Sequence, residues 1–213
     1  MSDRGFIFDL DGVITDTAEY HYRGWKRLAD EEGIPFTRED NEQLRGVSRR
    51  ESLNRLLKGR EIDEETAQEW MARKNGYYRS YIKDMTPADL LPGAREYLQA
   101  TREAGIGIGL ASASRNARDV VASLGIEELL DVLGDGHAVV NAKPAPDLFV
   151  WVGGGLGLPA AHCTVFEDAE AGVEAALKAG MKSVGIGPPE RVGQAHLVCD
   201  GLHQITVEEV LRL

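Results

Sequence analysis

Cysteine is scarce in this chain of 213 residues, which contains only Cys163 and Cys199. Two cysteines at this separation match neither a disulfide framework nor the ligand spacing of a zinc site, and we expect both to be small packing residues near strands. No apolar run approaches the roughly 20 residues needed to cross a bilayer. Residues 1–5 lack the features of a signal peptide. These absences predict a cytoplasmic protein without a membrane partner.

Positive charge is also in short supply. The chain has 24 basic against 35 acidic residues and a net charge of −11, which argues against a nucleic-acid partner because proteins that bind nucleic acids normally present a basic surface. An anionic small molecule is not excluded, since local lysines and helix N-termini create positive pockets in acidic proteins. With 43% hydrophobic and 28% charged residues, the composition is that of a folded soluble protein.

Two kinds of sequence pattern divide the chain. Residues 18–83 show helical spacing of apolar residues and almost no strand-like alternation. Within them, Trp25, Leu28 and Ala29 fall on one helical stripe, which we interpret as a packing surface. Beyond Pro92, short apolar strands alternate with helices, and this alternation favours a parallel sheet covered by helices.

We therefore expect an α/β fold with a Rossmann-like core domain, made of residues 1–16 and 84–213, and an all-helical cap domain inserted at residues 17–83. The strands expected are 6–9, 106–111, 163–166, 183–186 and 196–199, with a short element near 129–133. The helices expected in the core are 93–104, 117–124, 146–153, 169–179 and 207–211.

A run of three glycines, Gly153 to Gly155, lies at the end of the helix expected at 146–153. No strand immediately precedes the run and no Gly-Lys-Ser/Thr sequence follows it, so a phosphate-binding loop is only weakly indicated. Each interior glycine costs a helix about 1 kcal/mol relative to alanine. We interpret the run as a weakened helix end and assign it no function.

The segment 6–13, FIFDLDGV, is the most informative in the chain because two carboxylates follow a short apolar strand. Strand alternation points Asp9 and Asp11 the same way, at the edge where open α/β sheets bind ligands. Two like charges this close need a cation between them or a retained proton. A divalent metal would let Asp9 act as a nucleophile while Asp11 transfers protons. The alternative is a solvated turn of the kind that Asp and Gly form.

Ser112 and Lys143 are candidate phosphate ligands. Ser112 directly follows the strand expected at 106–111, where a hydroxyl and backbone N–H groups at a helix N-terminus form an anion site; the alternative is an ordinary helix cap. Pro144 favours an extended Lys143, whose ammonium group would reach inward onto a phosphate. The alternative for Lys143 is a solvated surface lysine.

The strand expected at 163–166 also ends in carboxylates, those of Glu167 and Asp168. Together with Asp9 they would complete a set of oxygen ligands of the kind that Mg²⁺ prefers. The alternative is a helix N-terminus that carries acidic residues, which is common. Because the four weak signals occur in order on successive elements, they reinforce one another.

These four segments resemble the motifs of the haloacid dehalogenase superfamily, and the resemblance covers essentially the whole chain. They are Asp-x-Asp-Gly-Val at 9–13, Ser112 after a strand, Lys143-Pro144, and Glu167-Asp168 with Gly172 following. Further segments resemble the β-phosphoglucomutase family within that superfamily. These are DLDGVITDTAEYH at 9–21, LRGVSR at 44–49, RKN at 73–75, TPAD at 86–89, ASAS at 111–114 and KPAPD at 143–147.

The resemblance implies that Asp9 is the nucleophile, which becomes an aspartyl phosphate, and that Asp11 is the general acid and base. It also implies a Mg²⁺ ion bound by the Asp9 carboxylate, the Asp11 backbone carbonyl, Glu167 and Asp168. The implied reaction interconverts β-D-glucose 1-phosphate and D-glucose 6-phosphate, with glucose 1,6-bisphosphate as intermediate and activator. The expected partner is a small sugar phosphate, and the expected state is a monomer.

Further residues are implied in substrate binding and closure. Ser112 and Lys143 would hold the transferring phosphate, and Thr17, His21 and Lys74 resemble hinge and cap residues that couple closure to Asp11. The substrate and its second phosphate would contact Gly46, Val47, Arg49, Ala113, Ser114, Arg115 and Asn116.

Three positions depart from the family pattern. Arg45 and Arg115 stand where lysine is familiar, and Ala142 replaces a small hydroxyl residue before Lys143. Since the fork of an arginine prefers bidentate geometry, these departures bear on substrate affinity and leave the chemistry intact. Two rival interpretations are a magnesium-dependent phosphatase of the same superfamily that acts on a small sugar phosphate, and a binding protein without catalysis. Retention of both Asp9 and Asp11 argues against the second.

Overall fold

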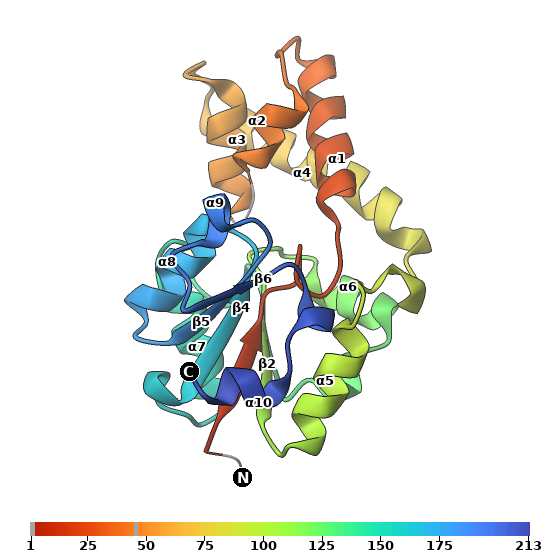
Figure 1. Cartoon of the computed structure of the whole chain (residues 1–213). Coiled ribbons are helices and arrows are strands. Elements are labelled where there is room, and N and C mark those ends of the chain that lie inside the picture. Colours follow the sequence, from red (N-terminus) through yellow and green to blue (C-terminus); the bar gives the residue numbers. More distant parts are fainter. Residues whose placement is uncertain (1–2, 45–46) are drawn as a thin grey trace.

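The computed structural model describes residues 3–44 and 47–213. Within these residues, six parallel strands form one sheet in the order β3-β2-β1-β4-β5-β6, with helices on both sides (Figure 1). The predicted α/β fold is therefore confirmed. The strands are β1 (Gly5–Phe8), β2 (Gly107–Ala111), β3 (Val132–Gly134), β4 (Cys163–Glu167), β5 (Lys182–Ile186) and β6 (Leu197–Cys199).

The helices divide into two groups. The helical insert, as we call the first group, follows β1 and consists of α1 (Ala18–Glu31), α2 (Arg38–Glu42), α3 (Arg49–Leu57) and α4 (Glu64–Tyr81). The second group contains α5 (Ala94–Glu103), α6 (Ala117–Leu124), α7 (Asp147–Gly155), α8 (Glu170–Lys178), α9 (Pro189–Val192) and α10 (Val207–Leu211). Short 3₁₀ turns lie at Ile82–Asp84, Pro87–Asp89, Glu127–Leu129, Ala160–His162 and Leu202–Gln204.

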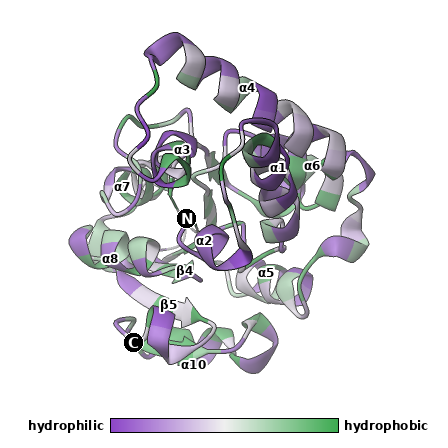
Figure 2. Cartoon of the chain, turned by 90° about the horizontal axis from the view of Figure 1, so that it is seen from above, coloured by the Kyte–Doolittle hydropathy of each residue, from purple (hydrophilic) through white to green (hydrophobic). Residues whose placement is uncertain are grey.

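Side chains of β1 alternate between two hydrophobic cores. Phe6 and Phe8 belong to the core that α5, α6 and α10 cover, whereas Ile7 belongs to the core under α7 and α8. Figure 2 shows α7 and α8 on one side of the sheet and α5 and α6 on the other. A parallel sheet with both faces covered needs strands that are apolar throughout, which is why β1 and β4 read as continuous apolar runs.

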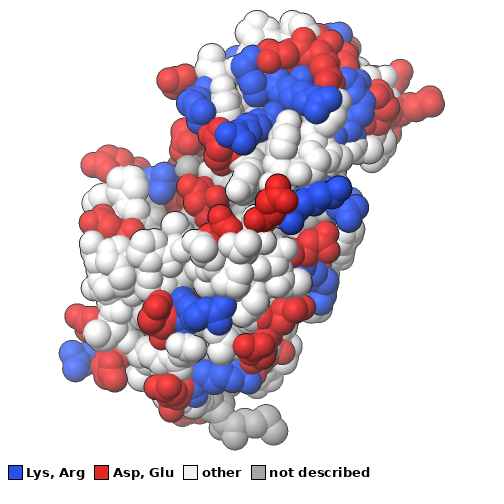
Figure 3. Space-filling view, turned by 90° about the vertical axis from the view of Figure 1, so that its right-hand side faces the viewer, with Lys and Arg blue, Asp and Glu red and all other residues white. Residues whose placement is uncertain are grey.

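The helical insert has a core of its own above the carboxyl edge of the sheet (Figure 1). Trp25, Leu28 and Ala29 of α1 pack there against α3 and α4, as their spacing predicts. On the face drawn in Figure 3, basic and acidic side chains are interleaved over the insert, and exposed pairs such as Arg23–Glu19 join them. Because exposed ion pairs contribute at most about 1 kcal/mol each, the apolar core is what stabilises the insert.

The cysteines lie beside strands, as the sequence predicts. Cys163 is buried at the start of β4, Cys199 is half-buried at the end of β6, and both are free thiols. In the described ranges, no helix combines the length and the apolar character that a bilayer crossing requires.

The glycine run has a structural explanation that the sequence did not supply. It forms the last turn of α7, where the helix lies against the sheet. A Cβ atom on Gly155 would lie 2.8 Å from Val132 Cγ1, and one on Gly109 of β2 would lie 2.4 Å from Val152 Cγ1. In contrast, a Cβ on Gly154 would meet nothing within 4 Å. Glycine therefore lets α7 approach β2 and β3 closely. Helix α9 was not expected at all.

The two neighbouring glycines provide a matched test of this packing. We expect Gly154→Ala to stabilise the protein by about 0.5–1 kcal/mol, because alanine is the better helix former. Gly155→Ala gains the same propensity but must displace the stiff Val132 side chain. We expect it to be less stable than Gly154→Ala by about 1–3 kcal/mol, as measured by urea unfolding. Equal free energies of unfolding for the two variants would contradict the close approach of α7 to the sheet.

Candidate active site

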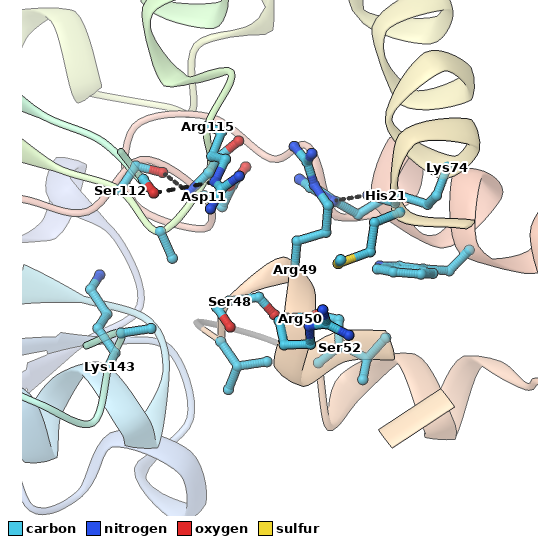
Figure 4. A pocket seen from close by; sticks show the side chains of 18 of the residues that line it. Asp11, His21, Ser48, Arg49, Arg50, Ser52, Lys74, Ser112, Arg115 and Lys143 are labelled. Atoms are coloured by element: carbon cyan, nitrogen blue, oxygen red, sulfur yellow. Dashed lines mark hydrogen bonds between the residues drawn. The ribbon is translucent and has the colours of Figure 1, made fainter. Parts of the chain in front are cut away.

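A cavity of about 380 Å³ lies between the carboxyl edge of the sheet and the helical insert. Figure 4 shows side chains that reach it from both sides, with Lys143, Ser112 and Asp11 from the sheet side and Arg49, His21 and Lys74 from the insert. The predicted site residues that line it are Asp9, Asp11, His21, Val47, Arg49, Lys74, Ser112, Ala113, Ser114, Arg115, Lys143 and Asp168.

Three predicted residues do not line the cavity, but each contacts one that does. Thr17 hydrogen-bonds Asp11, Glu167 pairs with Lys143, and the backbone N–H of Asn116 donates to Ser114 Oγ at 3.2 Å. Gly46, predicted to contact substrate, lies outside the described residues, as does the substituted Arg45.

Carboxylates from two neighbouring strands meet at one end of the cavity. Strands β1 and β4 are paired so that Phe8 lies opposite Phe166, which brings Asp9 and Glu167 to the same level of the sheet. Oxygen atoms of Asp9, Glu167 and Asp168 lie within 4.8 Å of one another, and all three residues are buried. The sequence predicted these three residues as metal ligands. The Asp11 carboxylate is not part of this cluster.

Lys143 completes the cluster from the segment before α7. Its Nζ lies 2.6 Å from Asp9 Oδ1 and 2.6 Å from Glu167 Oε1, and it donates to the carbonyl oxygen of Ala111 at 3.1 Å. The side chain is buried, so the alternative of a solvated surface lysine is wrong. Phe149 packs beneath, with its ring centre 4.7 Å from the ammonium nitrogen.

Two glycines leave room for these carboxylates. A Cβ on Gly172 would lie 1.8 Å from Glu167 Oε1, and one on Gly12 would lie 2.3 Å from Asp168 Oδ2. Gly12 also has a φ of +80°, a backbone conformation that glycine adopts readily. A residue larger than glycine at either position would therefore clash with the carboxylate of Glu167 or Asp168.

The cluster suits a divalent cation. Burial, opposed by Lys143 and reinforced by the nearby carboxylates of Glu167 and Asp168, raises the pKa of Asp9 well above its ordinary value. Lys143 and the Arg191 guanidinium, whose Nη2 lies 3.8 Å from Asp168 Oδ2, are the cations paired with the cluster among the described residues. A further cation between the carboxylates would reduce their mutual repulsion. Hard oxygen donors gathered in this way match the ligand preference of Mg²⁺, and the residues present fit such an ion.

A second group of polar atoms follows β2. Ser112 is buried, and its Oγ accepts a hydrogen bond from the Ser114 backbone N–H at 3.1 Å. Asn116 stands at the N-cap position of α6, but its side chain makes no capping bond. It reaches instead to Asn75 of α4, so an ordinary cap does not account for it. Arg115 donates to the carbonyl oxygen of Gly136 at 3.3 Å.

Arg49 and Arg115 bring positive charge to the far end of the cavity. Burial, followed by the charge of Arg115, lowers the pKa of Arg49. Among residues 3–44 and 47–213, no carboxylate lies within the 4.0 Å of an ion pair from either guanidinium group. This end of the cavity is therefore suited to an anion.

Asp11 is tied to the start of the insert. Its Oδ1 accepts a hydrogen bond from Thr17, whose Oγ1 in turn accepts one from the Tyr78 hydroxyl at 3.3 Å. Burial raises the pKa of Asp11, although the Thr17 hydrogen bond opposes the shift. A carboxyl group with a raised pKa is suited to general acid and base chemistry. Thr17 and Tyr78 flank the two chain connections to the insert.

Lys74 and His21 form a buried pair inside the insert. Lys74 Nζ lies 2.7 Å from His21 Nδ1 and also sits over the rings of Trp25 and Tyr78, at 5.0 and 4.9 Å from their centres. Burial, followed by the charges of Lys74 and Arg49, lowers the pKa of His21 well below its ordinary value. Burial, followed by the charge of Arg49, also lowers the pKa of Lys74 well below its ordinary value. With Nδ1 of a neutral His21 unprotonated, this nitrogen accepts a hydrogen bond from Lys74.

Sequence reasoning missed two contacts near the site. Asn75 accepts hydrogen bonds from both Arg49 and Asn116, although the sequence segment RKN was noted only for its resemblance. Arg191 of α9 donates to the Asp168 carbonyl oxygen at 2.6 Å. No periodicity marks a four-residue helix between prolines and glycines, so the sequence offered no signal for Arg191.

Comparisons with known proteins identify relatives of this chain. A family model described as haloacid dehalogenase-like hydrolase matches residues 4–180. A protein of Bacillus subtilis (strain 168) named beta-phosphoglucomutase is 43% identical over 209 residues, which is 96% of this chain and 92% of that protein. A Thermotoga maritima protein named phosphorylated carbohydrates phosphatase is 30% identical over 210 residues, 97% of this chain and 96% of that protein.

A solved structure is similarly close. The crystal structure of a beta-phosphoglucomutase from Clostridium difficile superposes with a TM-score of 0.95 at 41% identity, and the match covers 100% of this chain and 96% of that one.

The His21–Lys74 pair predicts a pH dependence of stability. Because the pKa of His21 is lowered in the folded state, the unfolded chain binds the extra proton as pH falls through the ordinary value of 6.5. The stability that a neutral His21 contributes is present above this pH and is lost below it, at up to about 1.4 kcal/mol per pH unit.

We expect this loss to be absent in His21→Gln, whose free energy of unfolding is to be measured from pH 8 to pH 5 beside wild type. The same substitution at exposed His203 controls for the loss of a histidine. Parallel curves for wild type and His21→Gln would contradict the assignment.

Proposed function

The chain belongs to the haloacid dehalogenase-like hydrolase family, and on this basis we propose that it interconverts β-D-glucose 1-phosphate and D-glucose 6-phosphate, the reaction of a β-phosphoglucomutase. The observation that carries the proposal is the joint likeness to the B. subtilis and C. difficile proteins of that name, over nearly the whole chain. The insert would be a cap domain of residues 17–83, and residues 1–16 and 84–213 would form the core.

In this proposal Asp9 is the nucleophile. Its carboxylate attacks the phosphorus atom of a phosphate ester, the P–O bond to the sugar breaks, and an aspartyl phosphate forms. A buried position between β1 and β4 holds the attacking oxygen in one place, and phosphoryl transfer depends mainly on positioning and on neutralising the spread negative charge. Asp9 is supported as the nucleophile because it lines the cavity, belongs to the carboxylate cluster and contacts Lys143.

Asp11 would supply and remove the proton on the sugar oxygen. It protonates the leaving oxygen when Asp9 is phosphorylated and accepts the proton of the attacking hydroxyl when the phosphoryl group returns to the sugar. Its hydrogen bond to Thr17, at the start of the cap, would couple its position to cap closure. His21 and Lys74 would take part in the same coupling.

A Mg²⁺ ion would be held by Asp9, Glu167, Asp168 and the backbone carbonyl of Asp11. When bound, it supplies positive charge that neutralises the transferring phosphoryl group. Lys143 and the Ser112 hydroxyl would hold the other oxygens of that group, since both stand at the cavity beside Asp9.

The second phosphate of the sugar would bind at the opposite end. Arg49 of the cap and Arg115 of the core bring two guanidinium groups together there, and an anion between them would draw the cap onto the core. The other contacts proposed at this end are with Gly46, Val47, Ala113, Ser114 and Asn116.

Such a site explains how one cavity would serve both half-reactions. A glucose 1,6-bisphosphate intermediate presents either phosphate to Arg49 while the other faces Asp9. The intermediate would turn around between the two transfers and leave as glucose 6-phosphate. A closed cap would exclude water and so protect the aspartyl phosphate from hydrolysis.

A second candidate function is hydrolysis of a small sugar phosphate. It is favoured by the 30% identity to the T. maritima protein named as a phosphatase, and it would use the same core residues. The difference lies in whether water or a sugar hydroxyl reaches the aspartyl phosphate.

The deciding experiment follows two products together. Protein with Mg²⁺, β-glucose 1-phosphate and a trace of glucose 1,6-bisphosphate is expected to yield glucose 6-phosphate without an equal amount of free phosphate. Free phosphate without glucose 6-phosphate would make the protein a phosphatase instead.

Replacing the nucleophile tests the assignment of Asp9. We expect Asp9→Asn to lower kcat by at least about a thousandfold, because the amide does not attack phosphorus. Urea unfolding should remain close to that of wild type, since Lys143 keeps its contact with Glu167. Substantial activity in the purified variant would refute the role of Asp9.

Arg49→Ala tests the far phosphate site. Loss of a charge-assisted contact costs about 1.5–3 kcal/mol, so we expect kcat/KM for β-glucose 1-phosphate to fall roughly 10- to 100-fold. Hydrolysis of p-nitrophenyl phosphate, which has no second phosphate, should change far less. Arg55→Ala on the exposed side of α3, where Arg55 pairs with Glu51, is the matched control. Equal losses in both reactions would count against the site.

A further inference from the structure

One amide oxygen joins the helical insert to the core beside the cavity. Asn75 Oδ1, from α4, accepts a hydrogen bond from Arg49 Nη2 of α3 at 2.8 Å and another from Asn116 Nδ2 at the start of α6 at 2.8 Å. A carbonyl oxygen has two lone pairs, and both are used here. Arg49 lines the cavity, whereas Asn116 and Asn75 stand behind its wall.

The two donors, Arg49 and Asn116, are residues that the proposed function assigns to binding the second phosphate of the sugar. Arg49 and Asn116 belong to segments far apart in the chain, and both donate hydrogen bonds to the side-chain oxygen of Asn75. Arg49 is partly buried near Arg115, with no carboxylate at ion-pair distance among the described residues. A neutral amide oxygen satisfies its hydrogen bond but not its charge. The position therefore favours an acceptor that carries negative charge.

We infer that Asn75 is a placeholder for the far phosphate: its amide oxygen occupies Arg49 and Asn116 until a phosphate oxygen takes over both donors. This inference rests on the proposed function, because it assumes that these two residues bind the second phosphate. Exchange of a neutral acceptor for a dianion gains charge-assisted hydrogen bonds, whereas a neutral sugar group gains no such advantage. Asn75 thereby contributes to the selection of sugars that carry a phosphate at this end.

A purely structural link makes the opposite prediction for two substitutions. If Asn75 only fastened the insert to the core, Asn75→Asp would keep both hydrogen bonds and bind ligand normally, and Asn75→Ala would bind it more weakly. As a placeholder, Asn75 competes with the ligand. Asn75→Asp then sets a carboxylate between the donors that both competes with the phosphate and repels it, and Asn75→Ala removes the competitor.

The test is isothermal titration of the whole protein with glucose 6-phosphate in the presence of Mg²⁺. We expect Asn75→Asp to raise the dissociation constant at least tenfold and Asn75→Ala to bind at least as tightly as wild type. Asn54→Asp, at an exposed position of α3, adds the same charge away from the cavity and should bind as wild type does. Weaker binding by Asn75→Ala, or unchanged binding by Asn75→Asp, would overturn the inference.

Two further measurements separate a loss of folding, or a wrong proposed function, from a wrong role for Asn75. Thermal unfolding identifies the variants that fold, and Asn75→Ser, which also lacks the amide oxygen, replaces Asn75→Ala if that variant does not fold, with the same expected affinity. Turnover of β-glucose 1-phosphate by wild type is measured in the same preparations. No turnover refutes the proposed function, whereas turnover together with the wrong order of affinities refutes only the placeholder role.

Discussion

The contact of Lys143 with Asp9 and Glu167 is the interaction on which the rest of the site depends. Strand pairing of β1 with β4 forces these carboxylates together, and without a cation between them their burial would be costly. Removal of the one cation that two buried carboxylates share leaves both unpaired, and breaking a buried ion pair in this way typically costs about 3–5 kcal/mol. Lys143 therefore makes the carboxylate cluster compatible with a folded sheet, and it does so from a loop that also faces the cavity. Stability and chemistry are served by the same ammonium group.

A second constraint comes from the way the helical insert is attached. Its two connections to the core pass close to each other, near Thr17 and Tyr78, and the side chains of these residues are hydrogen-bonded. Because Thr17 also donates a hydrogen bond to Asp11, a change in the orientation of the insert would shift the side chain of Asp11, which lines the cavity. The insert meets the core again through the hydrogen bond between Asn116 and Asn75, which lies three residues before Tyr78 on α4. Polar contacts from one helix of the insert therefore reach the core at two points.

Much of the fold and site followed from the sequence, for identifiable reasons. Strands β1 and β4 are apolar runs that end in acidic residues, and this pattern predicted both the sheet and the edge where Asp9 and Glu167 meet. The stripe of Trp25, Leu28 and Ala29 predicted the core of the insert in the same way. Local patterns do not reveal contacts between distant segments, so the hydrogen bonds of Asn75 with Arg49 and Asn116 could not be predicted from the sequence.

The glycine run is a similar case. In the sequence it looks like a weak helix end, because the reason for it lies across the interface in Val132. Helix α9 escaped notice since four residues carry no periodicity, and Arg191 was missed with it. Strand β3 is only three residues long, and the sequence indicated its neighbourhood without its type.

The position of β1 at the centre of the sheet also bears on how the chain assembles during synthesis. Its neighbours β2 and β4 lie more than a hundred residues further along the chain, so β1 is synthesised well before either of its partners. When β1 leaves the ribosome it has no neighbour, and its apolar side chains stay exposed until the helical insert has been made and β2 follows. The insert has its own core and is complete before then. It can therefore fold first, as a bundle that brings the two ends of its segment together and shortens the effective loop between β1 and β2.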